Sequence, residues 1–351
     1  MSYLAKPRVA HPKLPRNKHG LTYRDYEGVA STLCAGCGHD SITAAIVQAV
    51  FELDLPPWGM AKMSGIGCSS KTPAYFVSGS HGFNSVHGRM PSVTTGANAA
   101  NRDLLYLGVS GDGDSLSIGL GQLAHAIRRN VNMTYLVENN GVYGLTKGQF
   151  SASADVGSRA KKGATNQQPP IDPVSLALAA GATFVARGFS GDKAQLVPLL
   201  KAALNHNGFA LIDIISPCVT FNDHEGSTKS YAWSRAHVRR AVEADFIAPA
   251  DEITADYEPG ETISVPMHDG REVRLTKVDE DYDPRDRGQA LHYLQQHRSE
   301  GDIVTGILFI DEEPGDLHAV AGTTRTPLRD LDLDRLCPDQ AALDTIQATW
   351  V

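Results

Sequence analysis

Two short motifs carry oxygen ligands that suit a divalent cation. Residues 111–114 read GDGD after the apolar run 104–109, and residues 138–141 read ENNG after a second apolar run, 133–137. A helix is expected over 115–129 between them, so the motifs end the two strands of a β-α-β unit. Open α/β sheets bind ligands at the carboxyl ends of their strands. Carboxylate and amide oxygens beside a glycine-rich turn and a helix N-terminus therefore suggest a magnesium–diphosphate site.

Four cysteines offer a second kind of site. Cys34 and Cys37 form a CAGC pair, Cys68 lies in GIGCSS, and Cys218 follows the last expected strand of the αβ core. A C-x-x-C pair with two distant thiolates can close a four-sulfur site for zinc or for a [4Fe–4S] cluster, and the ligands alone leave both open. The second C-x-x-C of a zinc ribbon is missing from the sequence, which lowers zinc somewhat. Cys337, in the polar tail, is expected to be a free thiol.

The composition argues against several classes of protein. The 351 residues include 32 Lys and Arg against 40 Asp and Glu, a net charge of −8, which does not favour a nucleic-acid partner. A hydrophobic content of 42% supports a normal core. The sequence shows no apolar run long enough to span a membrane and no apolar signal region at its N-terminus. Five cysteines is an odd number, so we expect a cytoplasmic chain without a disulfide framework.

Expected strands alternate with expected helices through the first two thirds of the chain. This alternation predicts an α/β fold, a parallel sheet with helices on both faces. Residues 1–30 are expected to form an extended arm, and glycines are too dense over 59–96 for long elements. The other expected elements are a helix from Asp40 or Ser41 to Pro56, a strand over 104–109, a helix over 115–129, a strand over 133–137, a polar loop over 141–170, a helix opening at Asp172-Pro173, a strand over 183–186, a helix over 192–205 and a strand over 209–215.

The character of the sequence changes after about residue 235, where it becomes acidic. Segments 263–268 and 271–278 flank Asp269-Gly270, a pattern typical of a hairpin with a type I′ turn, and Pro266 indicates an edge strand. We expect this region to be a C-terminal extension that wraps the core or a partner. The remaining expectations are a strand over 303–311, a weakly helical tail from 328, and a division into an arm (1–30), an αβ domain (31–235) and the extension (236–351).

Taken in order, the motifs resemble the β subunit of 2-oxoacid:ferredoxin oxidoreductases, which are thiamine-diphosphate enzymes. The shared motifs are CAGCGHD, GIGCSSK, HGRMPSVTTGANAA, GDGDSLSIGLGQ, ENNGVYGLTKGQ and SPC, and they span residues 34–218. Several independent motifs in the correct order make the resemblance specific. The implied fold is a thiamine-diphosphate-binding domain of the diphosphate-binding (PP) type.

The resemblance implies three cofactors: thiamine diphosphate, Mg²⁺ and a [4Fe–4S] cluster. The Asp112 and Asn140 side chains and the Val142 carbonyl would bind Mg²⁺. Cys34, Cys37, Cys68 and Cys218 would bind the cluster, because electrons leaving the thiamine site need an acceptor and zinc cannot accept them. The implied contacts of thiamine diphosphate are Ile66, Gly67, Ser69, His87, Gly113, Asp114, Gly144, Leu145 and Thr146.

The implied reaction is the oxidative decarboxylation of a 2-oxoacid, which uses coenzyme A and reduces ferredoxin, or its reverse in CO₂ fixation. A separate α subunit would supply the aminopyrimidine half of the site, in an (αβ)₂ assembly. His87 and Lys71 are the implied catalytic residues, and His87 would shuttle a proton or bond the substrate carboxylate. Lys71 and Lys147 would bind a second substrate carboxylate and Leu145 would face the same pocket, which favours 2-oxoglutarate over pyruvate.

Three alternatives remain open at this point. The same enzyme class acts on pyruvate, branched-chain or aryl 2-oxoacids, in which case both lysines are solvated or bind coenzyme A phosphate. A non-catalytic subunit would have a structural Cys₄ zinc site and a vestigial GDG motif. A non-redox thiamine decarboxylase would not need the four cysteines. His39 is expected to be structural in all of them, and His81 is expected to bond loop carbonyls.

Overall fold

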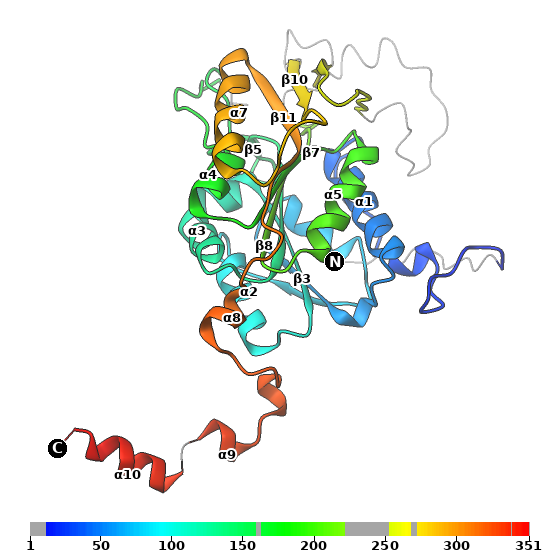
Figure 1. The fold of residues 1–351 in the computed structure, drawn as a ribbon. Helices are drawn as coiled ribbons and strands as arrows, with labels where there is room; N and C mark the ends of the chain where they lie inside the picture. Colours follow the sequence, from blue (N-terminus) through cyan, green and yellow to red (C-terminus); the bar gives the residue numbers. More distant parts are fainter. Residues whose placement is uncertain (1–11, 159–162, 222–252, 268–271, 338, 351) are drawn as a thin grey trace.

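The computed structural model describes residues 12–158, 163–221, 253–267, 272–337 and 339–350. A nine-stranded sheet runs through this part of the chain, with helices on both faces (Figure 1). Six of its strands are mutually parallel, which confirms the predicted α/β class. In spatial order they are β2 (His81–Asn84), β1 (Met60–Ser64), β3 (Leu105–Gly111), β4 (Met133–Asn139), β8 (Phe209–Ile215) and β7 (Phe184–Phe189).

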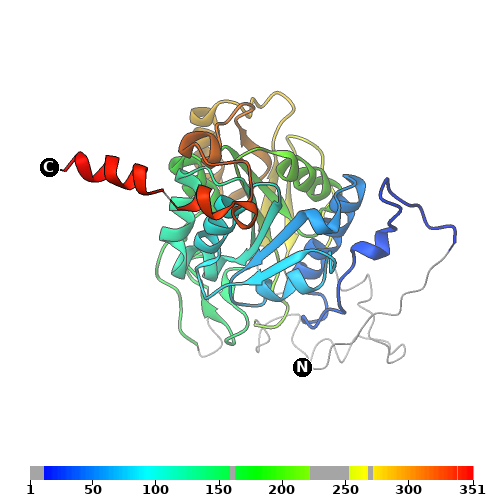
Figure 2. The same cartoon turned by 90° about the horizontal axis from the view of Figure 1, so that it is seen from below.

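The helices form two layers around this sheet (Figures 1 and 2). On one face, α1 (Gly38–Glu52) and α5 (Lys193–Asn205) bury side chains such as Ile46 and Leu200 in one core cluster. Complete burial of one such side chain stabilises the fold by about 1.5–3 kcal/mol. The helices of the second cluster, on the other face, are α2 (Met90–Ala100), α3 (Leu120–Arg128), α4 (Pro173–Ala180) and α7 (Arg287–Glu300).

Two helices begin where their capping residues predict. The Asp172 side chain accepts a hydrogen bond from Ser175 N–H at the start of α4, and Asp192 does the same for Gln195 N–H at the start of α5. Side-chain oxygens at these positions satisfy amide groups that have no partner inside the helix. Gly181 ends α4 with φ +91°, a conformation that favours glycine.

The prediction that 59–96 lacks long elements holds up to Arg89 and fails at α2. The segment contains β1, β2 and η3 (Ser69–Ala74), each of four to six residues, but α2 begins in it at Met90 and has 11 residues. Pro91 lies in the first turn of α2, where its missing N–H costs nothing. Met90 and Thr94 are fully buried, so packing against the sheet outweighs the low helix propensity of Gly96.

The helix predicted over 115–129 is broken. A π-helical turn, η4 (Gly113–Ile118), comes first, and α3 begins only after Gly119. The Gly119 amide donates to the Asp114 carbonyl at 2.9 Å, and a β-carbon on Gly119 would lie 2.9 Å from the carbonyl oxygen of Gly88. The backbone of Gly88 thus leaves no room for a side chain at the break, and turns of this kind are frequent at functional sites.

Much of the C-terminal extension, which was expected to wrap the core or a partner, belongs to the sheet itself. β11 (Asp302–Ile310) pairs antiparallel with β7 and parallel with β10 (Glu272–Lys277), and β9 (Thr262–Pro266) pairs antiparallel with β10. The predicted strand pairing and the edge position of Pro266 are thus confirmed. The predicted turn at Asp269-Gly270 lies outside the described residues.

The two ends of the chain behave differently. Near the N-terminus, η1 (Tyr23–Tyr26) anchors the segment that was expected to be extended, since Tyr26 is fully buried and its hydroxyl donates to the Leu55 carbonyl at 2.7 Å. The C-terminal tail is helical as predicted and projects from the body (Figures 1 and 2). Its elements are η6 (Leu328–Asp330), α9 (Leu333–Leu336) and α10 (Gln340–Ala348), none of which buries a residue.

A bilayer-spanning helix is not found in the described ranges, because none of the helices there is both long and apolar enough.

Candidate cofactor site

Asp112 follows β3 at the carboxyl edge of the sheet and is 1% exposed. The hydroxyls of Ser151 and Ser153 donate to its Oδ2, the latter at 2.6 Å, and Asn140 N–H lies 3.4 Å from Oδ1. Burial raises the pKa of Asp112, although these hydrogen bonds act in the opposite direction. The contacts described for this carboxylate include no cation, so a bound divalent ion would stabilise its charged form.

Asn140 follows the neighbouring strand β4 and lies beside Asp112. Its Oδ1 accepts a hydrogen bond from Val142 N–H at 3.0 Å, and its Nδ2 is 3.5 Å from His39 Nε2. The structure therefore brings together Asp112, Asn140 and Val142, which the sequence predicted to share one edge of the sheet. Ser151 and Ser153 were missed, because they lie in the long polar loop and nothing in their local sequence marks them.

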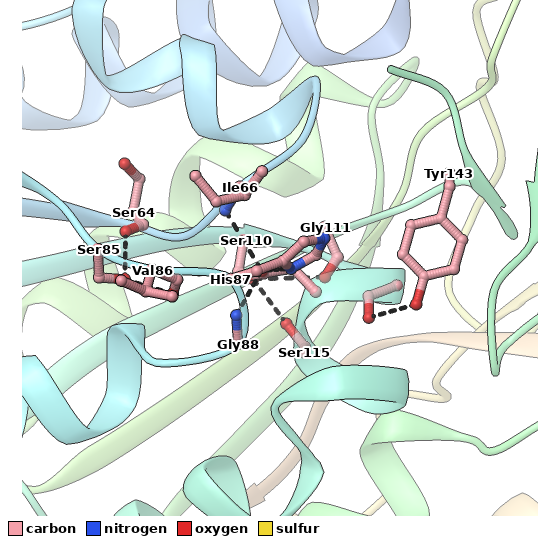
Figure 3. A network of polar contacts seen from close by, with 12 residues as sticks. Ser64, Ile66, Ser85, Val86, His87, Gly88, Ser110, Gly111, Ser115 and Tyr143 are labelled. Carbon is pink, nitrogen blue, oxygen red and sulfur yellow. Dashed lines mark hydrogen bonds and ion pairs between the residues drawn. The ribbon is translucent and has the colours of Figure 1, made fainter. Parts of the chain in front are cut away.

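Asp114 lies two residues further on, and its carboxylate joins three segments of the chain, whose residues Ile66, His87, Gly88 and Ser110 are labelled in Figure 3. Its Oδ1 accepts hydrogen bonds from Ile66 N–H at 3.3 Å and Gly88 N–H at 2.7 Å, and His87 Nδ1 contacts the same oxygen. Its Oδ2 accepts from the Ser110 hydroxyl at 2.6 Å. The sequence predicted that Asp114 lies against the diphosphate, but its hydrogen-bonding capacity is largely taken up by the protein.

Glycines make the close approaches in this network possible. A β-carbon on Gly65 would lie 1.8 Å from Asp114 Oδ2, and one on Gly113 would lie 2.5 Å from the Tyr143 ring. The Tyr143 hydroxyl donates to the Gly113 carbonyl at 3.1 Å, and its ring meets the His87 ring edge-on at 6.2 Å between centroids. The turn that contains Tyr143 is therefore fastened to the GDGD turn.

The four predicted cysteine ligands gather behind this edge of the sheet. Cys37 caps α1, whose first amide, Gly38 N–H, donates to the Pro217 carbonyl at 3.3 Å next to Cys218. The four thiols are close enough to interact electrostatically. Cys218 interacts with Cys37, Cys68 and Cys34, and Cys34 also interacts with Cys68. Segments that are far apart in sequence thus bring the four thiols into one neighbourhood.

Gly144, three residues after the ENNG motif, lies close to two of these sulfurs. A β-carbon on Gly144 would lie 3.2 Å from Cys68 Sγ and 3.8 Å from Cys218 Sγ. The sequence placed Gly144 near the diphosphate, and the structure adds that it contacts the cysteine site. Backbone next to thiolate or sulfide ligands tunes a metal centre through its dipoles.

The thiols of this set are protonated in the absence of a metal. Burial raises the pKa of Cys37 and Cys68, and it raises the pKa of Cys218 to about 11. A metal that binds here therefore has to displace these protons, because only thiolates bind metals well.

Sequence reasoning missed Glu138, which lies between the two candidate sites. It is completely buried at the end of β4, and burial, together with the charge of Asp40, raises its pKa well above the usual value. Its Oε2 is 3.5 Å from Nδ1 of His39, and burial lowers the pKa of His39 to about 4. Both groups are therefore held in their neutral forms, and His39, which also bonds the Ser216 hydroxyl at 2.6 Å, is structural as predicted.

The residues predicted to bind substrate lie at accessible positions. Lys71 Nζ donates to the Thr32 carbonyl at 3.0 Å, and its charge acts on Cys68. Leu145 is 55% exposed, and Lys147 is exposed with φ +79°. The last two belong, with Thr146, to the turn between β5 (Val142–Tyr143) and β6 (Gln149–Phe150).

A buried polar chain connects Asp112 to a neighbouring cavity of about 420 Å³. Ser153 Oγ also lies 2.9 Å from Asn139 Oδ1, and Asn139 Nδ2 donates to Asp213 at 2.9 Å. Asp213 accepts from Arg187 Nε at 2.8 Å, and Arg187 also contacts Asp172. This series of polar contacts holds Ser153 beside Asp112. The positive charge of Arg187 compensates the negative charges of the buried Asp213 and Asp172 carboxylates.

Comparison with known proteins agrees with this geometry. A family model, the thiamine pyrophosphate enzyme C-terminal TPP-binding domain, matches residues 59–214. The 2-oxoacid:ferredoxin oxidoreductase subunit beta of Saccharolobus solfataricus is 42% identical over 205 residues, which cover 58% of this chain and 67% of that protein. The chain belongs to the family of 2-oxoacid:ferredoxin oxidoreductase β subunits. It is also 46% identical over 191 residues to 2-oxoglutarate oxidoreductase subunit KorB of Mycobacterium tuberculosis, a match that spans 54% of this chain and only 51% of that relative.

The same family is found among solved structures. The 2-oxoglutarate:ferredoxin oxidoreductase from Magnetococcus marinus, solved with 2-oxoglutarate, coenzyme A and succinyl-CoA bound, superposes with a TM-score of 0.70 at 30% identity. The superposition covers 92% of this chain and 96% of the other, so it includes the C-terminal strands as well as the parallel half of the sheet.

Proposed function

We propose that this β subunit binds the diphosphate of thiamine diphosphate through Mg²⁺ and holds a [4Fe–4S] cluster beside it, within a CoA-dependent 2-oxoacid:ferredoxin oxidoreductase. The observation that carries the proposal is the convergence of four cysteines on the carboxyl edge that also holds Asp112 and Asn140. Only a redox version of the thiamine reaction requires both sites in one domain.

Each site fits the group assigned to it. Asp112 is a buried carboxylate whose described contacts leave its charge uncompensated, which suits a Mg²⁺ ligand beside Asn140 and the Val142 carbonyl. The four cysteines lie close enough to act on one another electrostatically, and Cys68 and Cys218 both lie beside Gly144, which suits a shared sulfur-ligated centre. When bound, thiamine diphosphate supplies an electron sink for decarboxylation and the cluster accepts single electrons.

The chain's own residues prepare the site for this chemistry. Asp112 and Asn140 would hold the metal that binds the diphosphate, and Gly144 lies beside Cys68 and Cys218 on the turn that follows Val142. Glu138 and His39 remain neutral, so they add no charge between the two centres. His87 presents a ring nitrogen that can hold a proton near the substrate.

We propose 2-oxoglutarate as the substrate. Relatives named for 2-oxoglutarate and the bound ligands of the Magnetococcus enzyme support this choice. Lys71 and Lys147 are the cations proposed to meet the second carboxylate, with Leu145 beside them. Pyruvate or another 2-oxoacid is the alternative within the same class.

The site is proposed to be completed by an α subunit, in an (αβ)₂ assembly that reduces ferredoxin. Ile66, Val86 and Ile118 are 37%, 74% and 44% exposed next to the Asp114 network, and a clustered apolar surface of this kind marks an interface. Location in the cytoplasm stays a prediction, which cell fractionation would test.

The test is to purify the chain with its α partner without oxygen and to follow CoA-dependent reduction of a viologen dye. We expect turnover with 2-oxoglutarate above that with pyruvate, together with iron, sulfide and a visible spectrum. Cys218→Ser should abolish the spectrum and turnover, whereas Cys337→Ser, on the exposed tail, should change neither. A colourless protein that contains one zinc ion would overturn the redox function.

The substrate assignment has its own test. Lys71→Ala should raise the KM for 2-oxoglutarate roughly tenfold more than the KM for pyruvate, because only the former has a second carboxylate to lose a charged partner. An equal effect on both KM values would contradict the role of Lys71 and leave the enzyme class intact.

A further inference from the structure

His87 is held by its surroundings in one orientation. Its Nδ1 contacts Asp114 Oδ1, and its ring meets Tyr143 edge-on. Tyr143 is itself fixed through its hydroxyl to Gly113, and Asp114 is fixed through the backbone of Gly88 (Figure 3). These two contacts fix the orientation of the His87 ring, which a histidine that only binds water does not need.

The hydrogen bonds of Asp114 decide which ring nitrogen of His87 carries the proton. The amides of Ile66 and Gly88 both donate to Oδ1, and an amide can only donate. An oxygen that accepts from two amides does not carry a proton, so the contact from His87 must also be a donation. The Nδ1 of neutral His87 is therefore protonated, and Nε2 is the acceptor.

The acceptor nitrogen is available for chemistry. Among the described residues, no hydrogen-bond partner is found for His87 Nε2, and the side chain is 32% exposed. His39 shows the contrast, since it is 1% exposed and its Nδ1 and Nε2 are both within reach of protein partners, Ser216 and Asn140. One histidine is built into the core, and the other is oriented with one nitrogen left open.

We propose that Asp114 is a positioning residue that fixes the Nδ1–H form of His87 and so presents Nε2 as the acceptor for a substrate proton. The inference rests on the proposed function. In the step, a bond from hydrogen to a substrate atom breaks and an N–H bond forms at Nε2, while the electron pair stays on the substrate atom. Asp114 accepts the Nδ1–H hydrogen bond of His87 throughout, which stabilises the imidazolium that results.

The proposal is tested by a double-mutant cycle in the αβ complex. His87→Asn keeps a side-chain amide that reaches Asp114 but removes Nε2, and we expect it to lower kcat about 10²- to 10⁴-fold. Asp114→Asn keeps the size of the side chain, and we expect a loss in kcat of about 10- to 100-fold. In the His87→Asn background, Asp114→Asn should change kcat by less than about twofold, because the residue acts through His87.

A merely structural role for Asp114 gives a different result. In that case Asp114→Asn would lower kcat by the same factor with and without His87, and the proposal would be wrong. Full activity of His87→Asn would overturn it as well. His81→Asn, on the exposed edge strand β2, is the matched control and should retain the kcat of the unchanged enzyme.

A second measurement needs neither turnover nor an Asp114 variant. In a ¹⁵N-histidine NMR spectrum of the complex, the resonances lost in His87→Asn identify His87, and we expect Nδ1 protonated and Nε2 bare. Protonated Nε2 with bare Nδ1 would refute the proposal. If the complex turned over no 2-oxoacid, the proposed function would fail, yet this spectrum would still decide the tautomer.

Discussion

Asp112 and Asp114 lie two residues apart on one turn, yet their carboxylates have different surroundings. Asp112 receives two serine hydroxyls and one long amide contact, and burial raises its pKa. Asp114 receives two amides, the Ser110 hydroxyl and His87. The first is left short of positive charge and suits a cation, whereas the second is satisfied by the protein and holds other groups in place. Position in a motif therefore does not define the role of a carboxylate, but its donors do.

The largest expected effect comes from removing the charge of Asp112. Asp112→Asn should weaken magnesium-dependent binding of thiamine diphosphate by at least about 100-fold, since the loss of even an outer partner of a metal site costs 10- to 100-fold. Isothermal titration of the complex measures it.

The same variant should not destabilise the chain when magnesium is absent. The raised pKa means that the carboxylate costs folding free energy at pH 7, a cost that the amide avoids. Thermal unfolding in a chelator should therefore show an unchanged or higher midpoint for Asp112→Asn and a lower one for Asp114→Asn. The opposite order would contradict the contrast between the two residues.

Gly65→Ala should break the network of Asp114 by steric overlap. A β-carbon at Gly65 would lie 1.8 Å from Asp114 Oδ2, so the variant should lose about 1–3 kcal/mol of unfolding free energy. Gly96→Ala, in α2, is the control, because its β-carbon would meet no atom within 4 Å and should stabilise the helix by about 0.5–1 kcal/mol. Urea denaturation compares them, and equal effects would speak against the tight packing at Asp114.

Lys62 is a buried cationic side chain that can be compared with the buried carboxylates of Asp112 and Asp114. Its Nζ donates to the carbonyls of Pro73 and Phe76 at 2.7 Å, which ties η3 to the sheet, and burial lowers its pKa from 10.5 to about 8. The folded chain therefore loses this proton at a lower pH than the unfolded chain. Between pH 8 and 10 the unfolded state binds more protons, so the Lys62 contribution to stability rises with pH.

The size of this effect can be measured against Lys62→Met. From pH 8 to 10 the stability of the natural chain should increase relative to the variant by on the order of 1–2 kcal/mol. Urea denaturation at several pH values gives both curves, and parallel curves would contradict the lowered pKa.

The smallest effect is expected for Ser153→Ala, which removes one hydroxyl from Asp112. A single hydrogen bond contributes about 0.5–1.5 kcal/mol, so magnesium affinity should fall by a few fold. Ser299→Ala, at the exposed end of α7, should leave the affinity unchanged. A loss as large as that of Asp112→Asn would mean that Ser153 is a ligand itself.

Sequence reasoning succeeded where the signal is local or where topology is simple. Asp112 and Asn140 were predicted to meet because both follow parallel strands, and the helix at Asp172 was predicted from Pro173 in its first turn. It failed at α1, where Cys37 and not Asp40 or Ser41 is the N-cap, and at Gly119, where the close approach of the Gly88 backbone is a distant contact that the local pattern does not display.

The same limit explains the missed site residues. Ser151 contacts Asp112 only because a long polar loop folds back onto the edge of the sheet, and the local sequence carries no mark of that path. Glu138 was visible as the polar residue at the end of an apolar run, but its unusual pKa results from burial that no pattern displays. Polar residues in buried strand positions are the signal to look for in related chains.

The turn that contains Gly144 contributes to both proposed sites, the magnesium site and the cysteine site. Val142, proposed to bind magnesium, and Gly144, packed on two cysteine sulfurs, are only two positions apart. An insertion or deletion here would shift both, so we expect the length of this hairpin to resist change even where its exposed tip varies. If oxygen damages the cysteine site, we expect the shared turn to loosen. Binding of the diphosphate would then weaken as well, so both sites would be lost together.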